Sequence, residues 1–134
     1  MTAVIYWSAT GNTEAMASAV AEGAGVEAVR VSDFSGNTDE YTSLALGCPA
    51  MGDEVLEEDE FEPFFTGIEG SISGKKILLF GSYDWGDGEW MRKWEDRVRA
   101  AGAVLVNDAG IIANLTPGDD ILSECRNLGK ALSE

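Results

Sequence analysis

Five short apolar runs alternate with amphipathic segments along this chain, and the alternation limits the folds open to it. The runs cover about residues 3–7, 26–31, 44–48, 76–81 and, in two pieces, 104–106 and 111–113. Helical patterns occupy residues 13–22, 61–68, 89–101 and 121–132. Strands that alternate with helices form a parallel sheet covered on both faces. The sequence therefore predicts an α/β fold, a doubly wound five-stranded parallel sheet with helices on both faces.

Length and composition favour one ordinary globular domain. The chain has 134 residues, 45% of them hydrophobic, so we expect a single domain over residues 1–134 with a sizeable core. No apolar run approaches the length of a membrane-spanning helix, which is about 18 residues. The first residues show no charged segment and no cleavage site of a secretory signal. We therefore expect a cytoplasmic monomer without a membrane partner.

The charge balance is strongly acidic, with a formal net charge of −15. Such a surface repels nucleic-acid phosphates and anionic membranes, so neither is an expected partner. It favours fast, salt-sensitive encounter with basic proteins. The most acidic part is residues 49–63, and the acidic run 53–62 within it is expected to form the docking rim; its acids are Asp53, Glu54, Glu57, Glu58, Asp59, Glu60 and Glu62.

Histidine is absent, and the two cysteines, Cys48 and Cys125, are not in a C-x-x-C pair. Ser-His-Asp and Cys-His catalysis and most zinc sites are thereby excluded. We expect both thiols to be buried and reduced, with no catalytic residue and no metal ligand.

The loop at residues 8–13, Ser-Ala-Thr-Gly-Asn-Thr, joins the first apolar run to the first helical pattern. It offers three hydroxyls and an amide, and Gly11 permits a positive φ. Strand, short polar loop and helix N-terminus is a geometry in which backbone N–H groups collect an anion. The first basic residue of the chain is Arg30, so we expect neutral donors to hold a phosphate here. The alternative is that Asn12 or Thr13 only caps the helix.

Two further loops follow the third and fourth strands, Pro-Ala-Met-Gly-Asp-Glu at 49–54 and Ser-Tyr-Asp-Trp-Gly-Asp-Gly at 82–88. With the strand order 2-1-3-4-5, all three loops converge at the carboxyl edge of the sheet, where such folds bind ligands. Met51 and Trp85 can bracket a flat aromatic ring. Gly52 and Gly86 let backbone approach the ring edge, and Glu54 can accept a hydrogen bond from a ring N–H. These loops together predict a site for a mononucleotide with a large ring.

These stretches resemble those of the short-chain flavodoxins, which are FMN-containing electron carriers. The resemblance rests on residues 6–8, 10–14, 47–54, 81–83 and 85–91, and it extends essentially from end to end. It implies a flavodoxin-like fold with FMN at the switch point of the sheet, which is the general ligand position in folds with this strand order.

By this resemblance, the phosphate of FMN lies against the hydroxyls and N–H groups of the first loop, with Ser82 at its side. The isoalloxazine ring lies between Met51 and Trp85, and Glu54 lies at flavin N3. The Gly52–Asp53 peptide is expected to flip so that its carbonyl meets N5–H. Backbone N–H groups from Asp84 to Gly86 should face the N1/O2 edge. The full expected cofactor-binding set is Ser8, Ala9, Thr10, Gly11, Asn12, Thr13, Pro49, Ala50, Met51, Gly52, Asp53, Glu54, Ser82, Tyr83, Asp84, Trp85, Gly86 and Asn114.

The implied function is low-potential one-electron transfer, with non-covalently bound FMN cycling between semiquinone and hydroquinone. The implied partners are reductases and oxidoreductases with basic patches, in a ferredoxin-like role. Two residues depart from the family pattern, since Ala9 and Asp84 stand where glycine is expected. Ala9 costs about 1 kcal/mol if its φ is positive. Asp84 is expected to oppose the second electron by repulsion, unless it points into solvent.

Other functions remain open from the residues alone. An FMN-dependent quinone or nitro reductase of the same fold is the main alternative, although Trp85 would block one face of the ring. A receiver domain shares the strand order, but it needs acidic residues where Ser8, Ala9 and Cys48 stand. A ligand-free acidic interaction module is the remaining alternative.

Overall fold

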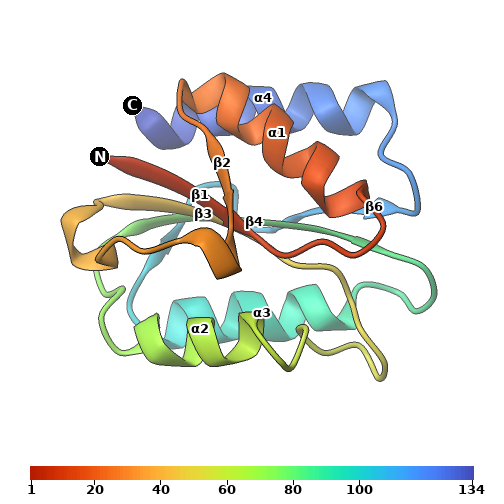
Figure 1. Ribbon diagram of the computed structural model, residues 1–134, viewed down its shortest axis with the longest axis horizontal. Helices are drawn as coiled ribbons and strands as arrows, with labels where there is room; N and C mark the ends of the chain where they lie inside the picture. The colour runs from red at the N-terminus through yellow and green to blue at the C-terminus, as the bar shows by residue number, and fades with distance from the viewer.

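The apolar runs pair side by side in one parallel sheet, which the computed structural model describes for all of residues 1–134 (Figure 1). The strand order is β2-β1-β3-β4-β5, and β6 pairs with the second half of β4. The predicted order 2-1-3-4-5 is thus confirmed. The strands are β1 (Thr2–Tyr6), β2 (Ala28–Arg30), β3 (Ser43–Gly47), β4 (Lys76–Tyr83), β5 (Val104–Leu105) and β6 (Ile111–Asn114).

The fifth apolar run forms two separate strands, β5 and β6, as its two pieces predicted. β5 pairs with the start of β4, at Lys76 and Ile77, while β6 pairs with its end, from Phe80 to Tyr83. Because β6 continues the pairing, β4 extends two residues beyond the predicted end at 81. Both pieces therefore occupy the same side of β4, and β6 brings its carboxyl end to the rim where the loops meet.

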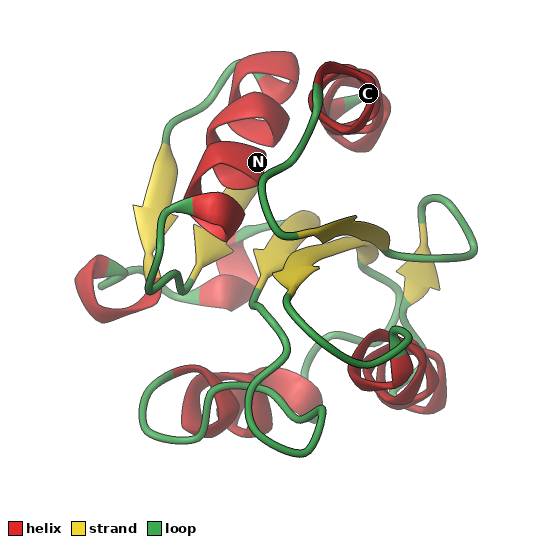
Figure 2. Ribbon diagram, turned by 90° about the vertical axis from the view of Figure 1, so that its right-hand side faces the viewer, coloured by secondary structure: helices red, strands yellow, loops and turns green.

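Four helices cover the sheet, two on each face (Figure 1). Helices α1 (Asn12–Ala24) and α4 (Asp119–Ser133) lie on one face, and α2 (Phe61–Glu69) and α3 (Glu89–Ala100) lie on the other. Figure 2 shows the same three layers from the side. Each face has its own buried apolar cluster, so the sheet is a shared wall between two cores. None of the four helices is long and apolar enough to cross a membrane.

The second strand is shorter than the predicted 26–31. Only Ala28–Arg30 pairs with β1, and the chain then turns through 3₁₀ segments η1 (Val31–Asp33) and η2 (Thr38–Glu40). β2 is an edge strand, and short edge strands limit unwanted pairing with other chains. The register places Arg30 opposite Tyr6, at the end of the strand nearest the first loop.

Helices α1 and α4 approach so closely that glycine is required at their contact. A Cβ on Gly23 would lie 1.9 Å from the carbonyl oxygen of Arg126. A Cβ on Gly129 would lie 2.2 Å from the carbonyl oxygen of Val20. Each helix thus contributes one glycine, and the backbone of the other helix packs against it.

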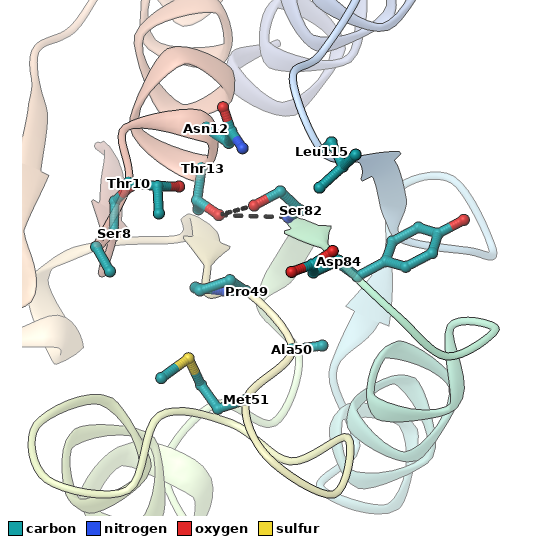
Figure 3. A pocket seen from close by; sticks show the side chains of 12 residues that line it. Ser8, Thr10, Asn12, Thr13, Pro49, Ala50, Met51, Ser82, Asp84 and Leu115 are labelled. Atoms are coloured by element: carbon teal, nitrogen blue, oxygen red, sulfur yellow. Dashed lines mark hydrogen bonds between the residues drawn. The ribbon is translucent and has the colours of Figure 1, made fainter.

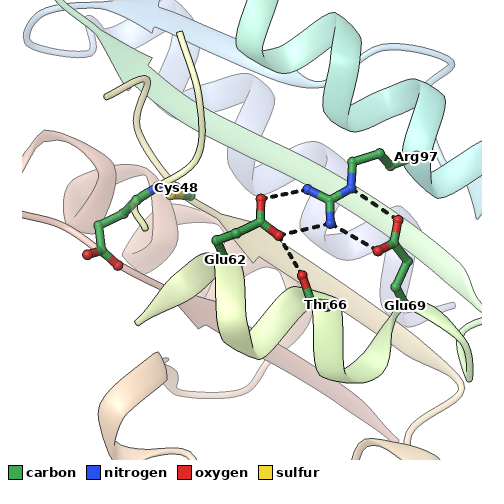
Figure 4. A network of polar contacts seen from close by, with 6 residues as sticks. Cys48, Glu62, Thr66, Glu69 and Arg97 are labelled. Atoms are coloured by element: carbon green, nitrogen blue, oxygen red, sulfur yellow. Dashed lines mark hydrogen bonds and ion pairs between the residues drawn. The ribbon is translucent and has the colours of Figure 1, made fainter. Parts of the chain in front are cut away.

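The opposite face is packed with aromatic side chains and tied by one arginine. Phe61 and Phe65 of α2 meet Trp94 of α3 edge to face. Arg97 of α3 donates to both carboxylates on α2, at 2.8–2.9 Å to Glu62 and 2.9–3.0 Å to Glu69 (Figure 4). The hydrogen bonds from Arg97 lower the pKa of Glu62. This bidentate geometry fixes the relative position of the two helices.

Two acids of the 49–63 run are buried, Glu54 and Glu57, and Glu57 starts a helix. The Glu57 carboxylate accepts 2.8 Å hydrogen bonds from the backbone N–H groups of Asp59, Glu60 and Phe61. The backbone N–H of Glu57 donates to the sulfur of Cys48. Glu57 therefore anchors the loop between β3 and α2 instead of belonging to the solvated rim.

Both cysteines are buried and unpaired, as expected. Burial raises the pKa of the Cys48 thiol, and it raises the pKa of the Cys125 thiol to about 12. Both are therefore protonated at neutral pH, and they behave as small core residues.

Candidate functional site

The loops that follow β1, β3 and β4 meet in one pocket at the carboxyl edge of the sheet (Figure 3). Leu115, after β6, completes the wall. Convergence of the three loops is therefore confirmed. The pocket is lined by Ser8, Ala9, Thr10, Asn12, Thr13, Pro49, Ala50, Met51, Ser82, Tyr83, Asp84 and Leu115.

The first loop presents a set of unpaired backbone donors. Gly11 has φ +96° and precedes the first turn of α1, where no side chain of its own could cap the helix. The buried Ser8 hydroxyl oxygen replaces that cap, accepting from the N–H groups of Gly11 and Glu14 at 3.2 Å each. The remaining N–H groups of the loop have no acceptor within the protein, and they belong to Ser8, Ala9, Thr10, Asn12 and Thr13. Unpaired N–H groups at a helix N-terminus suit an anion such as phosphate.

Two buried hydroxyls add to this donor set. Thr13 Oγ1 and Ser82 Oγ are 2.9 Å apart, and the Ser82 N–H donates to Thr13 Oγ1 (Figure 3). Only one of the two hydroxyl hydrogens can lie between the oxygens, so the other is free to donate to a ligand. The contact also ties the loop after β1 to β4. The alternative that Asn12 or Thr13 only caps the helix is wrong, because Gly11 is the N-cap residue and the Thr13 hydroxyl bonds to Ser82.

Ala9, the first departure from the family pattern, carries no backbone strain. The non-glycine residues with positive φ are Glu54, Asp108 and Leu115 only. The possible penalty of about 1 kcal/mol for alanine in a left-handed conformation does not apply here.

The second loop forms a small closed hairpin. Met51 and Val55 exchange two backbone hydrogen bonds, of 2.9 and 3.0 Å, around Gly52, Asp53 and Glu54. Gly52 has φ +48° and open space where a Cβ would stand. The Gly52 carbonyl and the Asp53 N–H have no partner within the protein. No hydrogen bond within the protein therefore holds this peptide, and its expected flip stays a prediction.

Glu54 joins the second loop to the third. Its side chain is buried, and Oε1 accepts from the N–H groups of Gly88 and Glu89 at 3.2 and 2.9 Å. Helix α3 begins there without a cap from its own N-cap residue, so Glu54 supplies it. Gly86 packs directly on this carboxylate, since a Cβ on it would lie 2.6 Å from Glu54 Cδ. The second oxygen, Oε2, makes no hydrogen bond within the protein.

The third loop is exposed and carries an indole ring, that of Trp85, and a carboxylate, that of Asp84. Trp85 is 60% exposed, so the face of its indole ring is accessible. The Asp84 carboxylate lines the pocket and makes no hydrogen bond or ion pair (Figure 3). The N–H groups of Asp84, Trp85 and Gly86 have no acceptor within the protein. Asp84 is itself exposed, so the choice between repulsion at a ring edge and screening by solvent stays a prediction.

Seven residues of the predicted set do not line the pocket itself. Gly11 begins α1, and Asn114 donates its amide to the carbonyl oxygens of Tyr83 and Asp84 at 3.2 and 3.3 Å. The others lie in the two loops that border the pocket: Gly52, Asp53, Glu54, Trp85 and Gly86. Their proximity to a bound ring stays a prediction.

Leu115 lines the pocket and was not predicted. It is 50% exposed, has φ +61°, and donates its N–H to the Tyr83 carbonyl. An available signal was its position directly after the last strand, at the same edge as the other three loops. An apolar residue in a loop gives no compositional warning of a ligand contact.

A doubly wound sheet with an anion-binding loop after its first strand, and ring-sized apolar side chains beside it, defines a nucleotide-binding α/β protein. The family model described as Flavodoxin matches residues 4–128, which is most of the chain. The chain belongs to the flavodoxin family.

Proteins named flavodoxin match this chain over nearly its whole length. It is 48% identical to a flavodoxin of Clostridium beijerinckii, covering 97% of each chain. It is 46% identical to a flavodoxin of Megasphaera elsdenii, covering 100% of this chain and 99% of that one. The solution structure of two-electron reduced Megasphaera elsdenii flavodoxin matches with a TM-score of 0.82 at 42% identity, over 99% of this chain and 98% of that one.

The protein is an FMN-binding electron carrier and not a substrate-converting enzyme. The reductase alternative has no better support, because the relatives at 46–48% identity carry the name flavodoxin. The residues present fit FMN on chemical grounds. Neutral N–H and hydroxyl donors lie at one end of the pocket, and Met51 borders the other.

Proposed function

We propose that the three loops hold FMN in one defined orientation. The phosphate lies against the unpaired N–H groups of residues 8–13 and the Thr13–Ser82 hydroxyl pair. The ring lies between Met51 and Trp85, with the N–H groups of residues 84–86 at one edge. The observation that carries this placement is the pair of unpartnered backbone donor sets, which flank a single pocket.

Bound FMN supplies two successive one-electron steps. The Gly52–Asp53 peptide is the protein's means of responding to them, because it has no internal hydrogen bond and lies in a hairpin with fixed ends. Its carbonyl can accept from a ring N–H in one oxidation state and turn away in another. Glu54 Oε2 is the oxygen available to the ring imide, since Oε1 caps α3.

Replacing Asp84 with asparagine is expected to raise the potential of the second one-electron step by about 30–60 mV. The Asp84 carboxylate faces the pocket, so it repels the negative charge that reduction adds to the nearby ring edge. Anaerobic redox titration of the holoprotein measures the shift. Asp87→Asn is the matched control, because Asp87 is in the same loop, pairs with Arg92 and does not line the pocket. An unchanged or lower second potential in Asp84→Asn would contradict the proposal.

The partners proposed here are redox proteins with basic patches, met by a monomer in the cytoplasm. The acids around the pocket support this surface, since Asp53, Glu58 and Asp59 are exposed on the loops beside it. Buried, unpaired cysteines are compatible with a reducing compartment. The exposed ring of Trp85, in the loop after β4, provides an apolar centre for the contact.

Electron transfer to a basic partner is expected to slow by roughly tenfold or more between about 0.01 M and about 1 M salt. Removing two rim charges, Glu58→Gln with Asp59→Asn, should lower the low-salt rate and flatten this dependence. Stopped-flow reduction of a basic reductase or cytochrome measures it. The control is Glu22→Gln with Glu27→Gln, which removes equal charge near the opposite end of α1 from the pocket. Rates independent of salt, or equal effects of both double variants, would exclude the rim as the docking surface.

A further inference from the structure

Arg30 reaches the phosphate loop from a neighbouring strand. It is the last residue of β2 and is half-buried. Its Nη1 and Nη2 both donate to the carbonyl oxygen of Ser8, at 3.0 and 2.5 Å. The guanidinium does not line the pocket. It therefore lies behind the loop, on the carbonyl side of the Ser8–Ala9 peptide.

The surroundings hold the guanidinium in place without neutralising it by a direct ion pair. Arg30 Cζ lies 5.6 Å from the centroid of the Tyr6 ring, in cation–π contact. The Tyr6 hydroxyl donates to Glu14 at 3.0 Å, so that carboxylate is bound to the phenol and not to the arginine. No carboxylate comes within ion-pair distance of Arg30.

The geometry of the peptide bond links Arg30 to the pocket. In a planar trans peptide the C=O and N–H point in opposite directions. Fixing the Ser8 carbonyl toward Arg30 therefore directs the Ala9 N–H away from Arg30, and Ala9 lines the pocket. Hydrogen bonds to the carbonyl also polarise the peptide and strengthen its N–H as a donor.

We propose that Arg30 is a positioning residue of the FMN phosphate site. It orients the Ser8–Ala9 peptide, keeps the Ser8 carbonyl away from the anion, and adds a positive charge behind neutral donors. The inference rests on the proposed placement of the phosphate at residues 8–13. The residues of this loop that line the pocket are uncharged, and the β1–β2 register places the first basic residue of the chain behind them.

The test is whether Arg30 favours FMN over riboflavin, which lacks the phosphate. The full-length protein, freed of flavin, is titrated with FMN, with riboflavin and with inorganic phosphate. In Arg30→Met we expect FMN and phosphate binding to weaken by about five- to tenfold, as loss of a charge-assisted contact implies. Riboflavin binding should stay unchanged, and the salt dependence of FMN binding should decrease. Arg30→Lys retains the charge and one donor group, so it should restore most of the preference for FMN.

The control is Lys130→Met, which removes the same charge from an exposed position in the last turn of α4. It should leave the ratio of FMN to riboflavin affinity unchanged. A purely structural role for Arg30 predicts equal weakening of both flavins in Arg30→Met, and that result would overturn the proposal. An unchanged ratio in Arg30→Met, or no recovery in Arg30→Lys, would also overturn it. If the unaltered protein does not bind FMN more tightly than riboflavin and does not bind phosphate, the placement of the phosphate itself is wrong.

Discussion

Replacing Gly129 with alanine is expected to lower the free energy of unfolding by about 3 kcal/mol or more. The new Cβ would lie 2.2 Å from the Val20 carbonyl oxygen and 3.0 Å from its carbonyl carbon. These are backbone atoms of α1, so no side-chain rotation relieves the overlap. The helices must separate, and the apolar cluster beneath them, which includes Cys125 and Leu132, then loses its packing.

Urea unfolding with saturating FMN, followed by far-UV circular dichroism, measures this loss as a lower midpoint at constant slope. Gly67→Ala is the matched control, because Gly67 is in α2 and has nothing within 4 Å of a built Cβ. Alanine there should stabilise by roughly 0.5–1 kcal/mol through its helix propensity. Equal and small effects at both positions would show that α1 and α4 are not in backbone contact in solution.

Replacing Gly86 with alanine is expected to disturb both the third loop and flavin binding. Two separate effects add at this position. Gly86 has φ +94°, which costs an alanine about 1 kcal/mol. The new Cβ would also lie 2.6–3.0 Å from the Glu54 carboxylate, pushing it off the N–H groups that it caps. Losing a buried charge-assisted cap costs about 1.5–3 kcal/mol more.

We expect the affinity for FMN to fall by about tenfold or more, since loops that border the ring both move. Fluorescence titration of the flavin-free protein measures the affinity, and urea unfolding measures the stability. Gly74→Ala separates the two causes, because Gly74 has φ +82° and open space around a built Cβ. The free energy of unfolding of Gly74→Ala should fall only by the cost of the positive φ, and this variant should bind FMN normally.

The double variant Glu54→Ala with Gly86→Ala identifies the clash. With the carboxylate gone, alanine at position 86 should carry only the backbone penalty, so the two substitutions are non-additive. Strict additivity would mean that the two residues do not touch. That outcome would refute the link between the second and third loops.

The sequence predicted the fold well because the relevant signals are local. Alternating apolar runs and helical stripes identified every strand and helix, and the ends differed by a few residues where pairing intervened. β2 is shorter than its β-rich run because it is an edge strand that turns into η1. β4 is longer because β6 continues to pair with it.

The site was only partly predictable. Residues that carry their chemistry in the motif, such as Thr13, Ser82 and Met51, line the pocket as expected. Leu115 was missed because an apolar loop residue has no distinctive signature. The capping of α3 by Glu54 was missed because the donors lie 34 and 35 residues further along the chain.

Periodicity and loop composition were sufficient to specify a doubly wound sheet and the edge at which its three loops converge. Three contacts came only from the folded arrangement: Arg30 behind the phosphate loop, Glu54 beneath Gly86, and Gly129 against Val20. Each of them joins segments distant along the chain, through strand register, loop packing or helix approach. Local patterns encode which face of an element is buried, whereas the atoms that meet across two elements depend on how those elements pack.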